Sequence, residues 1–467
     1  MTGSENLSIR KVNLHLSPMR ENYLLSILFA WLILVLLTNC QPKYFSQKSF
    51  SQRMEQDSVY KNDFTGVSVY DMNTKQYVVN HNADKYFTPA STTKLFTFYA
   101  ALKLLGNKPD LKLPALKYII KKDSLVFFGT GNPITLHLNF TDSTVWHFLK
   151  NRKENLYFSE SNWKEDFFGM GWSWDDFNDY YSPERSAMPL YGNIITFTAN
   201  PNKSLTFVPS FFKYDIFENK NSDEDFFVQR NLRQNFFFYT HQNIQKKQEQ
   251  EVPFITSAEL TAKLLSDTLK KVVYTVKYPM PKTGVETLFA GSADTVLRRM
   301  LQVSDNFLAE QILLMCAAQN LPNAELNTAK VIDLMLNNHL SDLTDKPRWV
   351  DGSGLSRMNL FTPRSQVELL QKIHTTMAIN EAGEKRLFGL LAVGGGHGTL
   401  QGRFKSAKPF IFGKSGSLSN NINLSGYLLT KSGKKLIFSF MNNHYTMLTS
   451  RIRKRMDEIL LEFYERY

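Results

Sequence analysis

Sequence patterns typical of β-strands lie near both ends of this chain, and patterns typical of α-helices lie between them. Residues 64–80 form two β-rich runs around a D-M-N-T turn at 71–74, which predicts a hairpin. Two longer apolar runs, 422–430 and 435–442, flank a K-S-G-K turn at 431–434. Helical patterns occupy 257–271, 293–301, 307–318, 328–340 and 363–377. This order of segments predicts one α/β domain that is split by an insertion.

The predicted insertion differs from the rest of the chain in its composition and in its secondary-structure pattern. From about residue 113 to residue 256 the chain has short strand patterns, Phe-rich loops and a polar stretch at 242–251. We therefore expect a mainly β region at 113–256, inserted between the two parts of the α/β domain at 44–112 and 257–467. A length of 467 residues is ample for this arrangement.

The net charge of +12 favours an anionic partner such as nucleic acid, a lipid surface or a cell-wall polymer. The basic residues are spread along the chain without an arginine-rich arm or a zinc-finger spacing, so we expect no nucleic-acid partner. The two cysteines, Cys40 and Cys316, are too few for a disulfide framework. Cys316 lies in the apolar run 307–318, where we expect a buried structural thiol.

The first 43 residues resemble an export segment. Residues 23–38 carry no charge and follow Arg20, and this run is shorter than the roughly 20 residues that span a bilayer. It ends in L-T-N-C at 37–40, which resembles a bacterial lipoprotein cleavage site with Asn39 in place of the usual small residue. We expect a lipid on Cys40 that holds an exported protein at the membrane in the periplasm, rather than an uncleaved anchor helix. We expect residues 41–60 to form a polar tether. Translation could also start at Met19 instead of Met1.

Three short motifs occur in a fixed order: S-T-T-K at 91–94, S-D-N at 304–306 and K-S-G at 414–416. This set of motifs is typical of serine acyl-transfer enzymes of the β-lactamase type. Each motif alone carries little weight, because each recurs elsewhere. The S-x-x-K pattern recurs at Ser8, Ser58, Ser161, Ser210 and Ser432, the S-x-N pattern at Ser4 and Ser419, and the K-[ST]-G pattern at Lys282 and Lys431.

The flanking sequence distinguishes Ser91 and Lys414 from the other copies of their motifs. Ser91 is the S-x-x-K serine that opens an apolar helix behind a proline loop, which places Lys94 one turn away on the same face. A serine needs such a nearby base to become a nucleophile, although an isolated motif of this kind is more often a helix cap. Lys414 leads into a strand that could line an extended substrate, whereas Lys282 lies in a proline-bracketed loop and Lys431 in a hairpin turn.

With these motifs in place, the chain resembles the class C low-molecular-mass penicillin-binding proteins, the D-alanyl-D-alanine carboxypeptidase/endopeptidase family. The resemblance covers roughly residues 60–460 and extends to the segments 129–133 (GTGNP), 171–176 (GWSWDD), 351–357 (DGSGLSR) and 398–400 (GTL) with Arg403. It implies a β-lactamase-like fold, an antiparallel sheet flanked by helices. Departures include Ser415 where the family usually has Thr, and Thr130 and Asn132 in the glycine-rich segment.

The resemblance also implies a role for each motif residue. Ser91 would be the acylated nucleophile and Lys94 its general base, which requires burial or a second cation nearby to lower the Lys94 pKa. Ser304 would pass a proton to the leaving D-alanine, and Asn306 would hold Lys94 and the substrate amide.

The third motif would bind the substrate backbone and its terminal carboxylate. Lys414 and Ser415 would hold the carboxylate, and Gly416 and Ser417 would line the substrate. The backbone N–H groups of Ser91 and Ser417 would form the oxyanion hole. The implied partners are peptidoglycan stem peptides and β-lactam antibiotics, and no metal or cofactor is needed.

Two alternatives stay open: a β-lactamase-like hydrolase and a non-catalytic wall-binding lipoprotein of the same fold. A β-lactamase needs a dedicated deacylating base, and no acidic residue is suitably placed after Asn306. For specificity, Asp176 and Arg357 could hold the ammonium and carboxylate of a zwitterionic stem-peptide side chain, such as that of diaminopimelate. Otherwise Asp176 caps a turn and Arg357 pairs with a local carboxylate such as Asp351.

Overall fold

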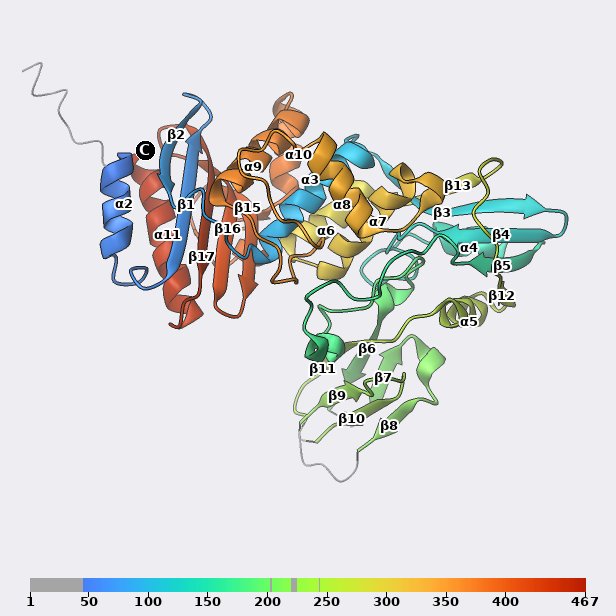
Figure 1. Ribbon diagram of the computed structural model, residues 1–467. Coiled ribbons are helices and arrows are strands. Elements are labelled where there is room, and N and C mark those ends of the chain that lie inside the picture. The colour runs from blue at the N-terminus through green and yellow to red at the C-terminus, as the bar shows by residue number, and fades with distance from the viewer. Residues whose placement is uncertain (1–44, 202–203, 220–224, 243) are drawn as a thin grey trace, which may run out of the picture.

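The computed structural model describes residues 45–201, 204–219, 225–242 and 244–467 (Figure 1). Its main feature is a six-stranded antiparallel sheet in the order β14-β15-β16-β17-β1-β2. The strands come from both ends of the chain, as predicted: β1 (Phe64–Asp71), β2 (Gln76–His81), β14 (Ala392–Val393), β15 (Ile411–Leu418), β16 (Asn421–Leu429) and β17 (Lys435–Asn443). The predicted α/β fold is confirmed.

Two terminal helices cover the outer face of this sheet, α2 (Gln47–Gln56) and α11 (Thr449–Arg466) (Figure 1). The expectation of a tether at 41–60 is therefore wrong for the part that the structure describes. Ser46 caps α2, and Phe50 and Met54 lie four residues apart on its buried face. Phe45 stacks on Phe463 of α11, with the ring centroids 4.2 Å apart. The polar composition of the segment conceals this short amphipathic helix.

Helices pack on the inner face, and two of them form the centre of the core. The inner set comprises α3 (Lys94–Leu104), α6 (Ala293–Gln302), α7 (Asn306–Asn320), α8 (Thr328–Asn338), α9 (Pro363–Met377) and α10 (Glu381–Leu390), with the short 3₁₀ helix η1 (Ala90–Thr93) leading into α3. Helices α3 and α7 are buried on nearly every side, as expected for helices that are apolar all round. Cys316 is buried in α7, which raises the pKa of its thiol and confirms a structural role.

The remaining strands form three smaller sheets beside the helical layer (Figure 1). The largest has the order β12-β5-β4-β3-β13, from β3 (Lys112–Lys121), β4 (Ser124–Gly129), β5 (Asn155–Ser159), β12 (Val273–Thr275) and β13 (Glu286–Ser292). The two three-stranded sheets combine β6 (Ile194–Ala199), β7 (Leu205–Val208) and β11 (Gln248–Pro253), and β8 (Ile216–Glu218), β9 (Phe227–Arg230) and β10 (Phe237–Thr240). Helices α4 (Thr144–Lys150) and α5 (Ala258–Leu269) accompany them.

The domain division at 113–256 stays a prediction. Strands β12 and β13, which follow residue 256, pair with β5 and β3. The apolar run at 23–38 and Cys40 lie outside the described residues. Within the described ranges, no helix is both long and apolar enough to cross a membrane.

Candidate functional site

Ser91 lies in η1, one turn before Lys94 at the start of α3. The Lys94 Nζ donates a hydrogen bond to the Ser91 Oγ at 2.9 Å. The backbone approaches Gly354 closely here, because a Cβ on Gly354 would lie 1.9 Å from the Ala90 carbonyl oxygen. Ala90 and Gly354 both have positive φ angles, 50° and 80°. The turn that presents Ser91 is thus strained and is held by a position that only glycine fits.

The Lys94 side chain is completely buried and its amine has three hydrogen-bond acceptors. Besides the Ser91 hydroxyl, it donates to Asn306 Oδ1 and to the Ser353 carbonyl oxygen, each at 2.7 Å. The Asn306 Nδ2 donates in turn to the Tyr181 carbonyl oxygen at 3.0 Å. The structure therefore brings Ser91, Lys94 and Asn306 together in one hydrogen-bonded group.

Burial lowers the pKa of Lys94 to about 8, because the charged form loses its hydration. The negative charges of Asp351, Asp305 and Glu310 oppose this shift. With a pKa near 8, about a tenth of the Lys94 amines are neutral at pH 7, whereas an ordinary lysine has almost none. The site thus provides a base next to Ser91.

Lys414 on β15 is a second buried lysine in the same site. It donates to Ser304 Oγ at 2.8 Å and to the Ser415 carbonyl oxygen at 2.7 Å. Burial lowers the pKa of Lys414 well below its usual value, and the charge of Lys94 lowers it further. Because the Ser304 oxygen accepts from Lys414, the Ser304 hydroxyl hydrogen is free to point to another acceptor.

The strand β15 carries the rest of the third motif. Ser415 Oγ donates to Thr399 Oγ1 at 2.8 Å, and Gly416 lies against η1, where a Cβ would come within 2.5 Å of the Pro89 carbonyl oxygen. Strand β14 pairs only with Phe412 and Gly413, so within the described chain no strand covers the outer edge of β15 from Lys414 onward. That edge, where Ser417 is exposed, is available to an extended peptide.

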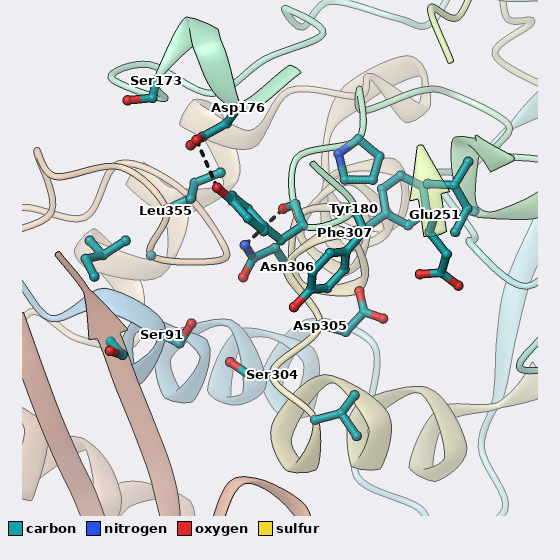
Figure 2. A pocket seen from close by; sticks show the side chains of 18 of the residues that line it. Ser91, Ser173, Asp176, Tyr180, Glu251, Ser304, Asp305, Asn306, Phe307 and Leu355 are labelled. Carbon is teal, nitrogen blue, oxygen red and sulfur yellow. Dashed lines mark hydrogen bonds between the residues drawn. The ribbon is translucent and has the colours of Figure 1, made fainter. Parts of the chain in front are cut away.

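These residues open into a cavity of about 780 Å³ (Figure 2). Ser91, Ser304 and Asn306 line it, and so do both specificity candidates, Asp176 and Arg357. Asp176 accepts from the Tyr181 hydroxyl at 2.9 Å, and Arg357 Nη1 donates to the Ser419 carbonyl oxygen at 3.2 Å. Burial raises the pKa of Asp176, and the positive charge of Arg357 opposes that shift.

The local pairing of Arg357 with Asp351, considered as an alternative, does not occur. Asp351 is fully buried and accepts from the Gly354 and Ser356 N–H groups and from the Trp172 indole at 2.8, 2.7 and 2.9 Å. Arg357 is exposed and donates instead to the Ser419 carbonyl oxygen, in the turn that follows β15.

In the sequence analysis we missed the buried charged side chains that support the Ser353 loop, whose carbonyl oxygen accepts from Lys94. Glu310 on α7 accepts from the Ser353 N–H at 2.7 Å, and Arg185 approaches Glu310 at 3.5 Å. Burial raises the pKa of Glu310 to about 7. A glutamate inside an apolar helical run is the one local signal of this group, since a buried carboxylate needs a partner.

The other motif copies lie away from the cavity wherever the structure describes them, except Ser419, which lines it. Lys282 is exposed in an irregular loop, and Lys431 lies in the β16–β17 turn near Glu465 at 3.8 Å. Ser4 and Ser8 lie outside the described residues. The described part of the chain contains no group of His, Cys, Asp or Glu residues that could hold a metal ion.

Comparison with known proteins gives consistent matches. The sequence model of the D-Ala-D-Ala carboxypeptidase 3 (S13) family matches residues 46–463. The D-alanyl-D-alanine carboxypeptidase DacB of Haemophilus influenzae is 22% identical over 426 residues, which cover 82% of this chain and 86% of that protein.

Two solved structures share the fold. The crystal structure of penicillin binding protein 4 (dacB) from Haemophilus influenzae matches with a TM-score of 0.69 and 20% identity, covering 89% of this chain and 99% of that one. The same protein complexed with a β-lactam matches with a TM-score of 0.64 and 19% identity, with the same coverage.

The lowered pKa of Lys94 predicts how acylation depends on pH. A general base acts only when it is neutral, so the limiting rate of acylation by a β-lactam should rise about ninefold from pH 6 to pH 7, about fivefold more by pH 8, and level off above pH 8. Stopped-flow measurement at saturating drug removes any contribution from binding. Lys431→Met should follow the same profile, and a rate that stays constant from pH 6 to 8 would contradict this role of Lys94.

Proposed function

Because the chain belongs to the D-Ala-D-Ala carboxypeptidase 3 (S13) family, we propose that Ser91 carries the acyl-enzyme of its reaction. The protein is a serine-type D-Ala-D-Ala carboxypeptidase of the penicillin-binding class that acts on peptidoglycan. The observation that supports the assignment of Ser91 is its 2.9 Å hydrogen bond from the buried amine of Lys94. No carboxylate in the described chain makes a hydrogen bond to either residue.

The reaction begins when neutral Lys94 removes the Ser91 hydroxyl proton. The Ser91 oxygen then bonds to the carbonyl carbon of the penultimate D-alanine, and the N–H groups of Ser91 and Ser417 stabilise the oxyanion. As the peptide C–N bond breaks, Ser304 gives its hydroxyl proton to the leaving nitrogen and takes up in its place the proton that Lys94 removed from Ser91, so that Ser304 is again a hydroxyl and Lys94 is again neutral. Water hydrolyses the ester and regenerates Ser91.

Substrate binding helps to activate the base. The terminal carboxylate binds at Lys414 with the Ser415 and Thr399 hydroxyls, which already contact each other. A carboxylate there stabilises the charged form of Lys414 and so raises its pKa. Charged Lys414 in turn disfavours a proton on Lys94, because the two buried amines repel each other. The neutral form of Lys94, which alone can accept the Ser91 proton, is therefore favoured while Lys414 is charged.

The exported, membrane-anchored location is also part of this proposal. It rests on the apolar run at 23–38 and on Cys40, with only four residues between Cys40 and the first described residue, Phe45. Four linking residues span at most about 18 Å, which would keep the α2 end of the protein close to the membrane surface.

Mass analysis after incubation with penicillin tests the nucleophile. The intact protein should gain one covalent adduct, because the Ser91 oxygen opens the β-lactam ring, and Ser91→Ala should gain none. Ser432→Ala, which changes an S-x-x-K serine outside the cavity, is the matched control and should keep the adduct. An adduct that persists in Ser91→Ala would refute the assignment. Absence of any adduct in the wild type would favour a non-catalytic scaffold, and rapid turnover of the drug would favour a β-lactamase.

Cys40→Ser tests the location. The substituted protein should leave the membrane fraction, because the lipid has no attachment site, whereas Cys316→Ser should fractionate as the wild type does. A Cys40→Ser protein that stays with the membrane after its signal segment is cleaved would argue against lipidation.

We also propose that Asp176 and Arg357 bind a zwitterionic side chain of the stem peptide, the acid holding its ammonium and the base its carboxylate. Both residues line the cavity that contains Ser91. Asp176→Ala and Arg357→Ala should each lower kcat/KM about tenfold or more for peptides with a diaminopimelate-like residue, since a charge-assisted hydrogen bond is lost. Cleavage of a peptide with an acetylated lysine at that position should change little. Equal losses on both peptides would show that these residues serve the fold.

A further inference from the structure

The catalytic cavity has a second arm that the assigned residues do not use. Figure 2 shows Ser173 and Asp176 on one side of the cavity and Glu251 with Tyr180 on the other. The lining of this second arm comes from five separate segments of the chain: His137, Asn139, Tyr180, Gly192, Glu251 and Arg299. It is continuous with the lining at Ser304 and Asp305.

His137 supplies a buried donor in this arm. Its side chain is 5% exposed, and its Nδ1 accepts from the Asn139 N–H at 3.2 Å. The neutral imidazole therefore carries its hydrogen on Nε2, and burial favours the neutral form. Within the described chain, Nε2 has no hydrogen-bond partner. A Cβ on Gly192 would lie 3.0 Å from Nε2, so glycine at this position leaves the nitrogen open.

Glu251 supplies an acceptor. It is half-buried on β11, opposite Thr196 of β6, and its carboxylate makes no hydrogen bond within the described chain. The nearby Arg299 is already paired with Asp305 at 3.1 Å, and Asp305 also caps α7. The arm thus combines a neutral donor, an unpaired carboxylate and a balanced ion pair.

Tyr180 and Asn139 add an aromatic surface and an amide. The Tyr180 side chain is 64% exposed and lines the cavity. A ligand that suits these groups must donate to Glu251, accept from His137 and pack an apolar face on an aromatic ring. An anion is disfavoured by Glu251, because nothing in the arm is left to neutralise both charges.

We propose that this arm binds a neutral, hydroxyl-rich saccharide, the sugar end of the peptidoglycan substrate. Each sugar hydroxyl both donates and accepts, and the C–H face of a sugar ring can pack on Tyr180. The inference rests on the proposed function, because a stem peptide that ends in D-Ala-D-Ala is joined at its other end to a sugar. Three residues separate that sugar from the acylated D-alanine, an extended length of about 10 Å. The arm would therefore anchor the substrate beyond the reacting peptide.

The test compares two substrates that differ only in the sugar. One is a disaccharide-pentapeptide, and the other is the same pentapeptide with an acetylated amino terminus in place of the sugar. For the wild type, kcat/KM for D-alanine release should be about tenfold higher with the disaccharide, the effect of a few hydrogen bonds. Glu251→Ala and Tyr180→Ala should each bring this ratio close to one. Penicillin acylation of each variant shows that its catalytic centre is assembled.

Glu249→Ala is the matched control, because Glu249 lies on the same strand β11 but does not line the cavity. It should keep the wild-type ratio. The inference is overturned if the wild type cleaves both substrates equally, if Glu251→Ala keeps the wild-type ratio, or if Glu249→Ala lowers it as much. It is also overturned if Glu251→Ala removes a preference for a sugar-free cross-linked dimer, since the arm would then bind peptide. Failure of Ser91 acylation in the wild type would instead contradict the proposed function.

Discussion

The buried amine of Lys94 is the contact on which the site depends, because it joins three segments that are far apart in the sequence. It donates to Ser91 before α3, to Asn306 at the start of α7 and to the Ser353 carbonyl in the loop before α9. An ammonium group without water is costly, so every one of its protons needs an acceptor. The three contacts fix the position of the amine, whereas its burial lowers its pKa to about 8.

The region that carries Trp172 and Arg185 supports this contact through the Ser353 loop. Trp172 donates to Asp351, and Arg185 lies against Glu310, so two side chains from this region end at carboxylates that flank the Ser353 loop. Arg185 is itself 3% exposed and donates to the carbonyl oxygens of Asp166 and Phe168 at 2.9 Å each. A buried carboxylate that loses its cation is strongly destabilising. The region thus shapes the cavity and also keeps the catalytic loop in place.

Local sequence patterns predicted the α/β class and the elements that carry the motif residues, whereas the β-lactamase-like fold followed from the family resemblance. A proline loop before an apolar helix predicts where Ser91 and Lys94 lie, because one helical turn fixes their relation. Paired strands and their turns were equally visible. The buried charged side chains that support the site could not be predicted in this way. Glu310 and Arg185 lie 125 residues apart in the sequence, and only the folded chain shows that they meet. Helix α2 was missed for a different reason: two apolar side chains in a polar segment are a weak pattern, and its stability comes from packing on α11.

The pairing of β1 with β17 joins the first strand of the sheet to the last, with Phe64 opposite Asn443. A growing chain exposes the Ser91 helix early, but β15, which brings Lys414, and β17, which completes the sheet around β1, come near its end. Contacts of such long sequence separation form slowly, because the intervening chain must first be ordered. A chain that ends before β15 therefore contains Ser91 and Lys94 but lacks Lys414. The main sheet, and the cavity wall that β15 contributes to it, can therefore be complete only after the last strand has been synthesised.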